Sequence, residues 1–260
     1  VISPPYAASE MPLSGVGDLG GLVEDACVAS YALKDLMFEG GILYEEGFKP
    51  LNIRPLWIGV IPAYEAMTSE RPVAAPGARE GTVQRPPGGA QDRIAAAVGA
   101  AGVAMPIGDL YEALTRGTVE GTVASPVSIT PYGLHEVIGH STKGANLGSF
   151  TVVYSINEDT WQSLEEDQRA LITELAEKSQ QSLCEGLNQS VEDSYREMEK
   201  ENVSSTDVSE DPEAWDALLE PTRQNWVDDL EKMGKPAGQV LEDFEAALEK
   251  HAHRAERTTP

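Results

Sequence analysis

The apolar and polar positions along the first 160 residues follow two alternating periods. A continuous apolar run at 56–61 predicts a buried strand, and stripes with helical spacing at 90–101 and 109–116 predict amphipathic helices. Further short strand candidates lie at 81–86, 102–105 and 154–157. Because strands and helices alternate, the pattern predicts an α/β protein with a mostly parallel sheet.

A different pattern begins at Ser163, which has Glu166 three residues after it and so forms a candidate capping box. Apolar residues then recur at helical spacing over 171–198, and no proline follows before position 212. A helix that is continuous to about Glu201 would be roughly 57 Å long. Such a helix exceeds one small lobe, so we expect it to cross between two.

The two ends of this long helix are expected to pack on different lobes. Its early part, near Leu171 and Leu175, should contact the lobe that holds the strand at 56–61, and its late part, near Val191 and Met198, should contact the other lobe. Closure of the lobes is expected to flex the helix near Gly186.

The composition is that of a folded chain with a strong negative charge. The 260 residues include 43 acidic and 19 basic side chains, a net charge of -24, which disfavours nucleic acid and anionic lipid as partners. No apolar stretch approaches the ~20 residues of a membrane-spanning helix. The two cysteines, Cys27 and Cys184, could form one disulfide, but their spacing does not decide it.

Two motifs suggest alternative functions. Gly15, Gly17 and Gly20 match the dinucleotide fingerprint and would fit an NAD(P)-dependent oxidoreductase, but the Pro-rich and Ser-rich segment before them predicts no strand. His135 and His140 suggest a zinc hydrolase, yet a spacing of five residues puts them on different faces of a helix. We therefore expect no catalytic residues, no cofactor and no metal.

Arg85 is the strongest candidate for binding. It ends a strand candidate within GTVQRPPGG, just before the glycines that open the next helix. A guanidinium group matches the geometry of a carboxylate, and free N–H groups at a helix start can add donors. The pattern predicts an anion site, with a surface arginine in a loop as the alternative.

Four blocks in order along the chain resemble the solute receptors of TRAP transporters, the DctP family. They are ERPVAAPGAREGTVQRPPGG, AMPIGDLYEALTRGTVEGT, YGLHEV and VYSINEDTWQSLEEDQRALI. The resemblance implies a periplasmic, non-enzymatic receptor that binds a small organic carboxylate and delivers it to the membrane subunits of the transporter. It implies a type II periplasmic-binding-protein fold, with two α/β lobes, hinge strands and a long helix behind both.

The same resemblance implies domain boundaries and a ligand site. Residues 1–62 and 151–190 would form lobe 1, without the first strand and helix of the family, and residues 63–150 and 191–260 would form lobe 2. Arg85 would clamp the carboxylate. The other residues implied around the cleft are Tyr64, Glu65, Ile107, Ala124, Ser125 and Ser128.

Glu65 stands where many acid-binding members of the family have a second arginine. A carboxylate there would repel a second carboxylate of the ligand, so the resemblance favours a monocarboxylate. The alternative for Glu65 is a surface acid that faces outward.

Overall fold

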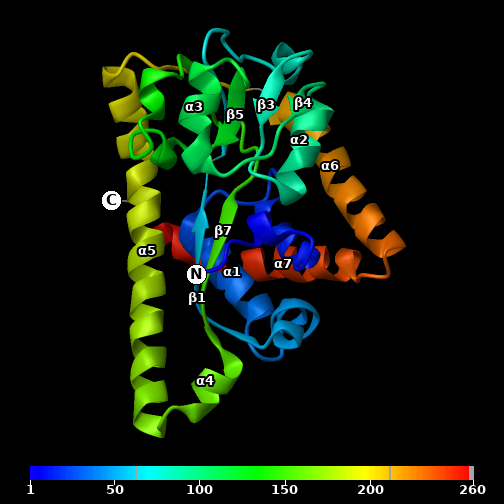
Figure 1. Ribbon diagram of the computed structural model, residues 1–260, viewed down its shortest axis with the longest axis vertical. Helices are drawn as coiled ribbons and strands as arrows, with labels where there is room; N and C mark the ends of the chain where they lie inside the picture. Colours follow the sequence, from blue (N-terminus) through cyan, green and yellow to red (C-terminus); the bar gives the residue numbers. More distant parts are fainter. Residues whose placement is uncertain (63, 211, 258–260) are drawn as a thin grey trace.

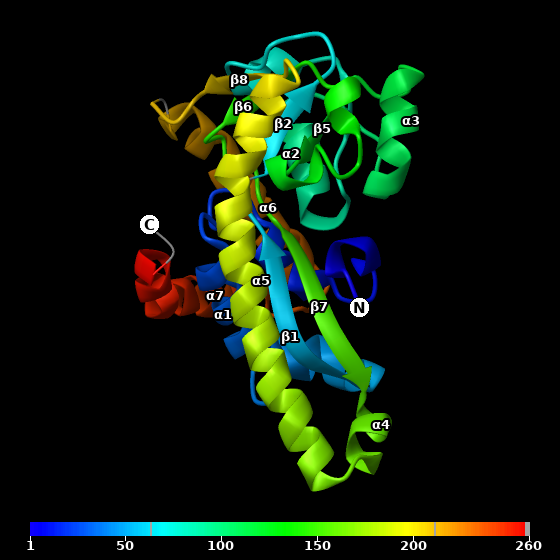
Figure 2. The same ribbon diagram turned by 90° about the vertical axis from the view of Figure 1, so that its left-hand side faces the viewer.

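The computed structural model describes residues 1–62, 64–210 and 212–257. Two long strands, β1 (Ile53–Ile61) and β7 (Phe150–Asn157), pair antiparallel as a ribbon that lies along the long axis in the middle of the molecule (Figures 1 and 2). At one end of this ribbon lies a six-stranded sheet in the order β4-β3-β5-β2-β6-β8. Its strands are β2 (Glu65–Thr68), β3 (Val83–Arg85), β4 (Ala101–Gly102), β5 (Gly121–Ala124), β6 (His140–Lys143) and β8 (Ser204–Asp207).

The six-stranded sheet is mostly parallel, as expected, with β2 as the one strand that runs the other way. β3 is parallel to β4 and β5, and β6 is parallel to β8, but β2 runs antiparallel to both of its neighbours, β5 and β6. The helices α2 (Asp92–Ala97) and α3 (Leu110–Thr115) connect β3, β4 and β5 and keep these strands parallel. β2 instead follows β1 almost directly and enters the sheet from the opposite end.

The remaining helices cover the two sheets. They are α1 (Ala26–Met37), α4 (Glu158–Ser163), α5 (Glu166–Lys200), α6 (Pro212–Lys232) and α7 (Ala237–His251). Among the shorter helical turns are η1 (Pro4–Ala7), η2 (Pro12–Asp18), η6 (Gly89–Gln91), η8 (Pro126–Ser128) and η9 (Leu134–Glu136). Within the described residues, none of the helices has the length and apolar character to cross a lipid bilayer.

The long helix is confirmed, but its cap lies elsewhere. α5 is 35 residues long, about 52 Å at 1.5 Å per residue, and passes Gly186 without a break (Figure 2). Glu165 and Gln168 form its capping box. Ser163 instead ends the short helix α4, where its hydroxyl donates to the Thr160 carbonyl at 2.7 Å.

The middle of α5 packs on the ribbon. The side-chain oxygen of Gln180 accepts a hydrogen bond from the Ile58 N–H at 3.1 Å, so the helix satisfies part of the open edge of β1. Gly59 allows this approach, because a Cβ atom there would lie 2.4 Å from the Leu183 side chain. Ribbon and helix therefore form one close-packed unit.

The two ends of α5 differ in how deeply their apolar side chains are buried. Tyr195 and Met198 are buried against the six-stranded sheet, as expected for the late part. Leu171 and Leu175 are 56% and 50% exposed, so the expectation that the early part packs on the ribbon's lobe is wrong. α4 and the following turn carry the first turns of α5 beyond the body of the protein (Figure 1).

The C-terminal helices pack across the chain. One apolar cluster joins α1 and β1 to Trp226 and Leu230 of α6 and to Val240 and Phe244 of α7. The division into lobes placed all of 191–260 with the second lobe, whereas α7 lies against α1. The sequence resemblance did not indicate this return of the chain.

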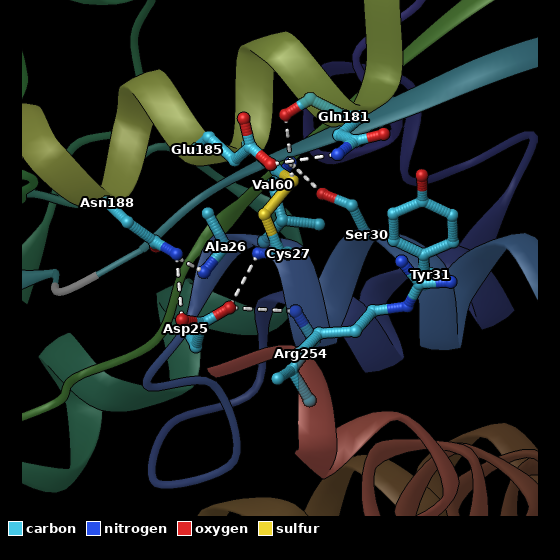
Figure 3. Close-up of a disulfide and its surroundings, with 12 residues drawn as sticks. Asp25, Ala26, Cys27, Ser30, Tyr31, Val60, Gln181, Glu185, Asn188 and Arg254 are labelled. Carbon is cyan, nitrogen blue, oxygen red and sulfur yellow. Dashed lines mark hydrogen bonds between the residues drawn. A yellow bond between two sulfur atoms is a disulfide. The ribbon is translucent and has the colours of Figure 1, made fainter. Parts of the chain in front are cut away.

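Cys27 and Cys184 form a disulfide that links α1 to the middle of α5 (Figure 3). Asn188 supports the same contact, because its Oδ1 accepts from the Ala26 N–H at 2.7 Å and its Nδ2 donates to Asp25 at 2.7 Å. Asp25 also accepts from the Cys27 N–H as the N-cap of α1. The pairing that the cysteine spacing left open is thus fixed by the packing of the two helices.

Candidate functional site

Most of the residues expected to bind ligand lie at one end of the strands in the six-stranded sheet. β3 and β5 are parallel, so Arg85 and Ser125 lie at the same end of neighbouring strands. β2 is antiparallel to β5, and its first residue pairs with Ala124, which brings Tyr64 to this end of the strands as well. β1 leads into β2 at the same place, so this end of the strands faces the ribbon.

Arg85 is the most deeply buried large side chain at this end of the strands, with 1% of its surface exposed. Its Nε donates to the Met105 carbonyl at 2.8 Å, and its Nη2 lies 3.4 Å from the Tyr6 hydroxyl. Among the side chains that the structure describes, no carboxylate lies within ion-pair distance of Arg85. A buried cation without a counter-ion is costly, so the site favours an anion.

Three aromatic rings lie beside this arginine. Tyr6 meets the ring of Phe150 edge-on, with centroids 5.0 Å apart, and Tyr64 lies parallel to Phe150 with centroids 6.5 Å apart. Tyr64 is 4% exposed, and this burial raises its pKa above the ordinary value, while the nearby charge of Arg85 acts in the opposite direction. The rings thus give an apolar surface next to a buried positive charge.

Ile107 and Ser125 also lie at the site. The Ile107 N–H is 3.4 Å from the Tyr6 hydroxyl, so this backbone donor and Arg85 approach the same oxygen. Ser125 is fully buried, and its hydroxyl donates to the Pro62 carbonyl at 2.7 Å. Ser125 therefore fastens the end of β5 to the segment between β1 and β2.

Glu65 does not border this group, which corrects the expectation drawn from the family resemblance. Its two carboxylate oxygens accept from the backbone N–H groups of Gly144 and Ala145, at 2.9 and 3.1 Å, and from the Thr142 hydroxyl. Burial raises its pKa, and these hydrogen bonds lower it. The alternative of an outward-facing acid is also wrong, because Glu65 is 1% exposed.

Ala124 and Ser128 lie on the same side as Glu65. Successive residues of a strand point to opposite faces, so Tyr64 and Glu65 must separate. Ala124 joins the apolar cluster of Met198 on α5, and Ser128 ends η8, which contacts α5. The structure therefore brings Tyr64, Arg85, Ile107 and Ser125 together and places the other three expected residues toward the long helix.

Two residues at or near the site were missed from the sequence. Tyr6 lies in a Pro-rich segment without periodicity, so no sequence pattern marks it. Asp18 ends η2, where one carboxylate oxygen accepts from the N–H and hydroxyl of Thr151 at 2.9 and 3.0 Å. Its other oxygen is buried without a hydrogen-bond partner among the described residues, and burial raises the pKa of Asp18 to about 8.

The two alternative motifs do not form the sites they suggested. Gly15 and Gly17 lie within η2, and the described residues before them form short helical turns rather than the strand that a dinucleotide site needs. His135 belongs to η9 and His140 begins β6. Among the described residues, no three His, Cys, Asp or Glu side chains are grouped so that they could hold a metal ion.

Sequence comparison decides the family. The family described as bacterial extracellular solute-binding protein, family 7 (DctP), matches residues 51–229. The chain belongs to this family. No protein of curated function matches the sequence.

Solved structures of TRAP solute-binding proteins share the fold. A TRAP periplasmic solute-binding protein from Bordetella bronchiseptica with bound mandelate matches at 23% identity and a TM-score of 0.81. The match covers 96% of this chain and 79% of the Bordetella chain. A TRAP solute-binding protein from Rhodoferax ferrireducens with copurified benzoate matches over 97% and 79%, at 19% identity and a TM-score of 0.86. One from Sulfitobacter with bound β-D-galacturonate matches over 94% and 79%, at 16% identity and a TM-score of 0.81.

These likenesses establish the architecture of this DctP-family chain. They are consistent with the two-lobed periplasmic-binding-protein fold that the sequence blocks implied.

Proposed function

We propose that this DctP-family protein is an extracytoplasmic receptor that binds a small organic carboxylate at Arg85. The observation that carries the proposal is a guanidinium group buried at the C-terminal end of β3 with no carboxylate partner among the described side chains. A ligand carboxylate would supply the missing negative charge. The protein would release the bound ligand unchanged, because this role requires recognition without covalent chemistry.

The hydrogen bond from Arg85 Nε to Met105 fixes which part of the guanidinium meets the ligand. Because Nε is taken, the two terminal nitrogens, Nη1 and Nη2, are the pair that can contact both oxygens of a carboxylate. Mandelate, benzoate and galacturonate, found in three proteins of this fold, share a carboxylate but little else. That common group supports a carboxylate as the feature recognised here.

The membrane subunits of a TRAP transporter are the proposed recipients of the ligand, and the periplasm is the proposed location. The fold suits capture and release, because the site lies where the β1–β7 ribbon meets the six-stranded sheet. In this proposal the residues around the six-stranded sheet form one lobe, and α1, the ribbon and α7 form the other. Flexing of the ribbon and of α5 would open and close the site.

Replacing Arg85 tests the proposal. The purified protein is screened by thermal shift against mandelate, benzoate and galacturonate, and the best ligand is then titrated by calorimetry. Hydrogen bonds to charged groups contribute roughly 1.5 to 3 kcal/mol, so Arg85→Gln should weaken binding by about tenfold to over a hundredfold. Arg85→Lys should restore little, because an ammonium lacks the planar pair of donors.

Arg116→Gln is the matched control. Arg116 is an exposed arginine at the C-terminal end of α3 that pairs with Glu112, so its loss removes one positive charge from the surface. The control should bind as the wild type does. Equal affinity of wild type and Arg85→Gln for every ligand that stabilises the protein would reject Arg85 as the carboxylate site.

A further inference from the structure

The geometry points to Tyr6 as a specificity-determining residue that makes the site selective for aromatic monocarboxylates. This inference rests on the proposed carboxylate site at Arg85. In it, the Tyr6 hydroxyl contacts the ligand carboxylate beside the arginine, and the Tyr6 ring forms one wall against the ligand's own ring.

The hydrogen bonding at Tyr6 leaves its proton for the ligand. The phenol oxygen lies 3.4 Å from both Arg85 Nη2 and the Ile107 N–H, and both of these groups can only donate. The oxygen therefore acts as acceptor toward both, and its own hydrogen must point away from them. A carboxylate held by Arg85 offers an acceptor for this third donor.

The segment that carries Tyr6 is built into the site. Ile2 pairs with Val153 of β7 through two backbone hydrogen bonds of 2.8 Å, which ties the start of η1 to the ribbon. On the other side, Gly88 has a φ of +113°, and a Cβ atom there would lie 3.3 Å from the Pro5 carbonyl. The loop after Arg85 thus uses a glycine to let the backbone of η1 approach closely.

The surroundings of Arg85 favour an aromatic ring over a sugar. Tyr6 and Tyr64 both lie against Phe150, so the surface beside the guanidinium is made of ring faces and edges. The buried hydroxyls of Ser125 and Thr122 already donate to backbone carbonyls, those of Pro62 and Arg85 respectively. A ligand with many hydroxyl groups would bury them here with few free partners.

The charge of the site favours one carboxylate. Among the side chains that the structure describes, Arg85 is the only buried lysine or arginine. A second carboxylate of the ligand would lie near the rings without a cation to match it, which is costly. Benzoate is therefore the probe with the fitting chemistry, and succinate and galacturonate are the contrasting ones.

The test separates the hydroxyl from the ring. Calorimetry is run with benzoate and with cyclohexanecarboxylate, which has the same carbon skeleton without the aromatic face, on wild type, Tyr6→Phe and Tyr6→Ala. Loss of one hydrogen bond to a charged group predicts that Tyr6→Phe weakens both ligands by about tenfold. Loss of an aromatic contact predicts that Tyr6→Ala also lowers the preference for benzoate by about twofold to tenfold.

Tyr111→Phe is the matched control, because its hydroxyl donates to Glu136 on the surface instead of facing Arg85. Binding of benzoate to both Tyr6 variants as in the wild type would overturn the inference. So would tighter binding by Tyr6→Ala, which would mean that the phenol blocks the site. Tight binding of succinate or galacturonate in preference to benzoate would overturn the proposed selectivity, whereas failure of the carboxylate site itself would appear as unchanged affinity in Arg85→Gln.

Discussion

Opening the Cys27–Cys184 disulfide is expected to lower the free energy of unfolding by about 5 kcal/mol, because the bond closes a very long loop in the unfolded chain. The two cysteines are 157 residues apart in sequence. For a loop of this size the chain-entropy relation gives a loss of roughly 17 cal/mol/K, or about 5 kcal/mol at 25 °C. The corresponding fall in Tm is about 10 to 20 °C for a protein of this size.

The folded state should change little when the bond opens. Asn188 still holds Asp25 and Ala26, and Gln180 still bonds to Ile58, so α1, α5 and β1 keep their contacts. The effect therefore acts on the unfolded chain, which gains freedom when the crosslink is lost.

Urea unfolding followed by tryptophan fluorescence measures this effect in three samples: the oxidised wild type, the wild type in dithiothreitol, and Cys27→Ala/Cys184→Ala. The reduced wild type keeps both sulfur atoms and so separates the crosslink from the packing of the side chains. Alkylation under denaturing conditions reports the number of free thiols in each sample. The same unfolding midpoint in oxidised and fully reduced protein would refute the entropic argument, and two free thiols in the untreated protein would refute the pairing itself.

Two further changes probe buried carboxylates. Asp18 has a folded pKa of about 8, above that of the unfolded chain, so the folded state holds the proton more tightly and stability falls as the pH rises from about 4 to 8. Asp18→Asn removes this titration, and its stability relative to wild type in urea should rise by about 2 to 3 kcal/mol between pH 5 and 7.5; a constant difference would contradict the assignment. Glu65→Gln should lower the free energy of unfolding by about 1.5 to 3 kcal/mol, since an amide offers one oxygen to the donors of Gly144, Ala145 and Thr142, and it should leave the preference between benzoate and succinate unchanged. A gain of succinate binding in Glu65→Gln would return this residue to the ligand site.

The sequence carried enough local information to predict the elements that position the site. The apolar run at 56–61 became part of β1, and the strand before PPGG became β3, with Arg85 as its last residue. The length of α5 was also predictable, because its apolar stripe and lack of proline are local properties. The exact cap was not, since Ser163 and Glu165 both precede an acidic or amide residue at the required spacing.

Contacts between distant segments were beyond these patterns. Tyr6 reaches Arg85 because Ile2 pairs with β7 and η1 packs on the loop after β3, and the single bridge between residues 2 and 153 has no signature in either segment. The return of α7 onto α1 and the pairing of Cys27 with Cys184 are of the same kind. Each depends on the path of the whole chain, which neither periodicity nor the family blocks encode.

Tyr64 and Glu65 show how one residue of strand register decides the chemistry of a site. The family blocks placed both beside the ligand, but a strand turns successive side chains to opposite faces, so only one of them can remain there. Tyr64 faces Phe150 and Arg85, and Glu65 faces the loop before β7 and the long helix. A one-residue slip of β2 would exchange a buried phenol for a buried carboxylate beside the guanidinium, and so supply a counter-ion that Arg85 does not have among the described side chains. The hydrogen bonds that hold Glu65 on its own face therefore also keep Arg85 available for a ligand.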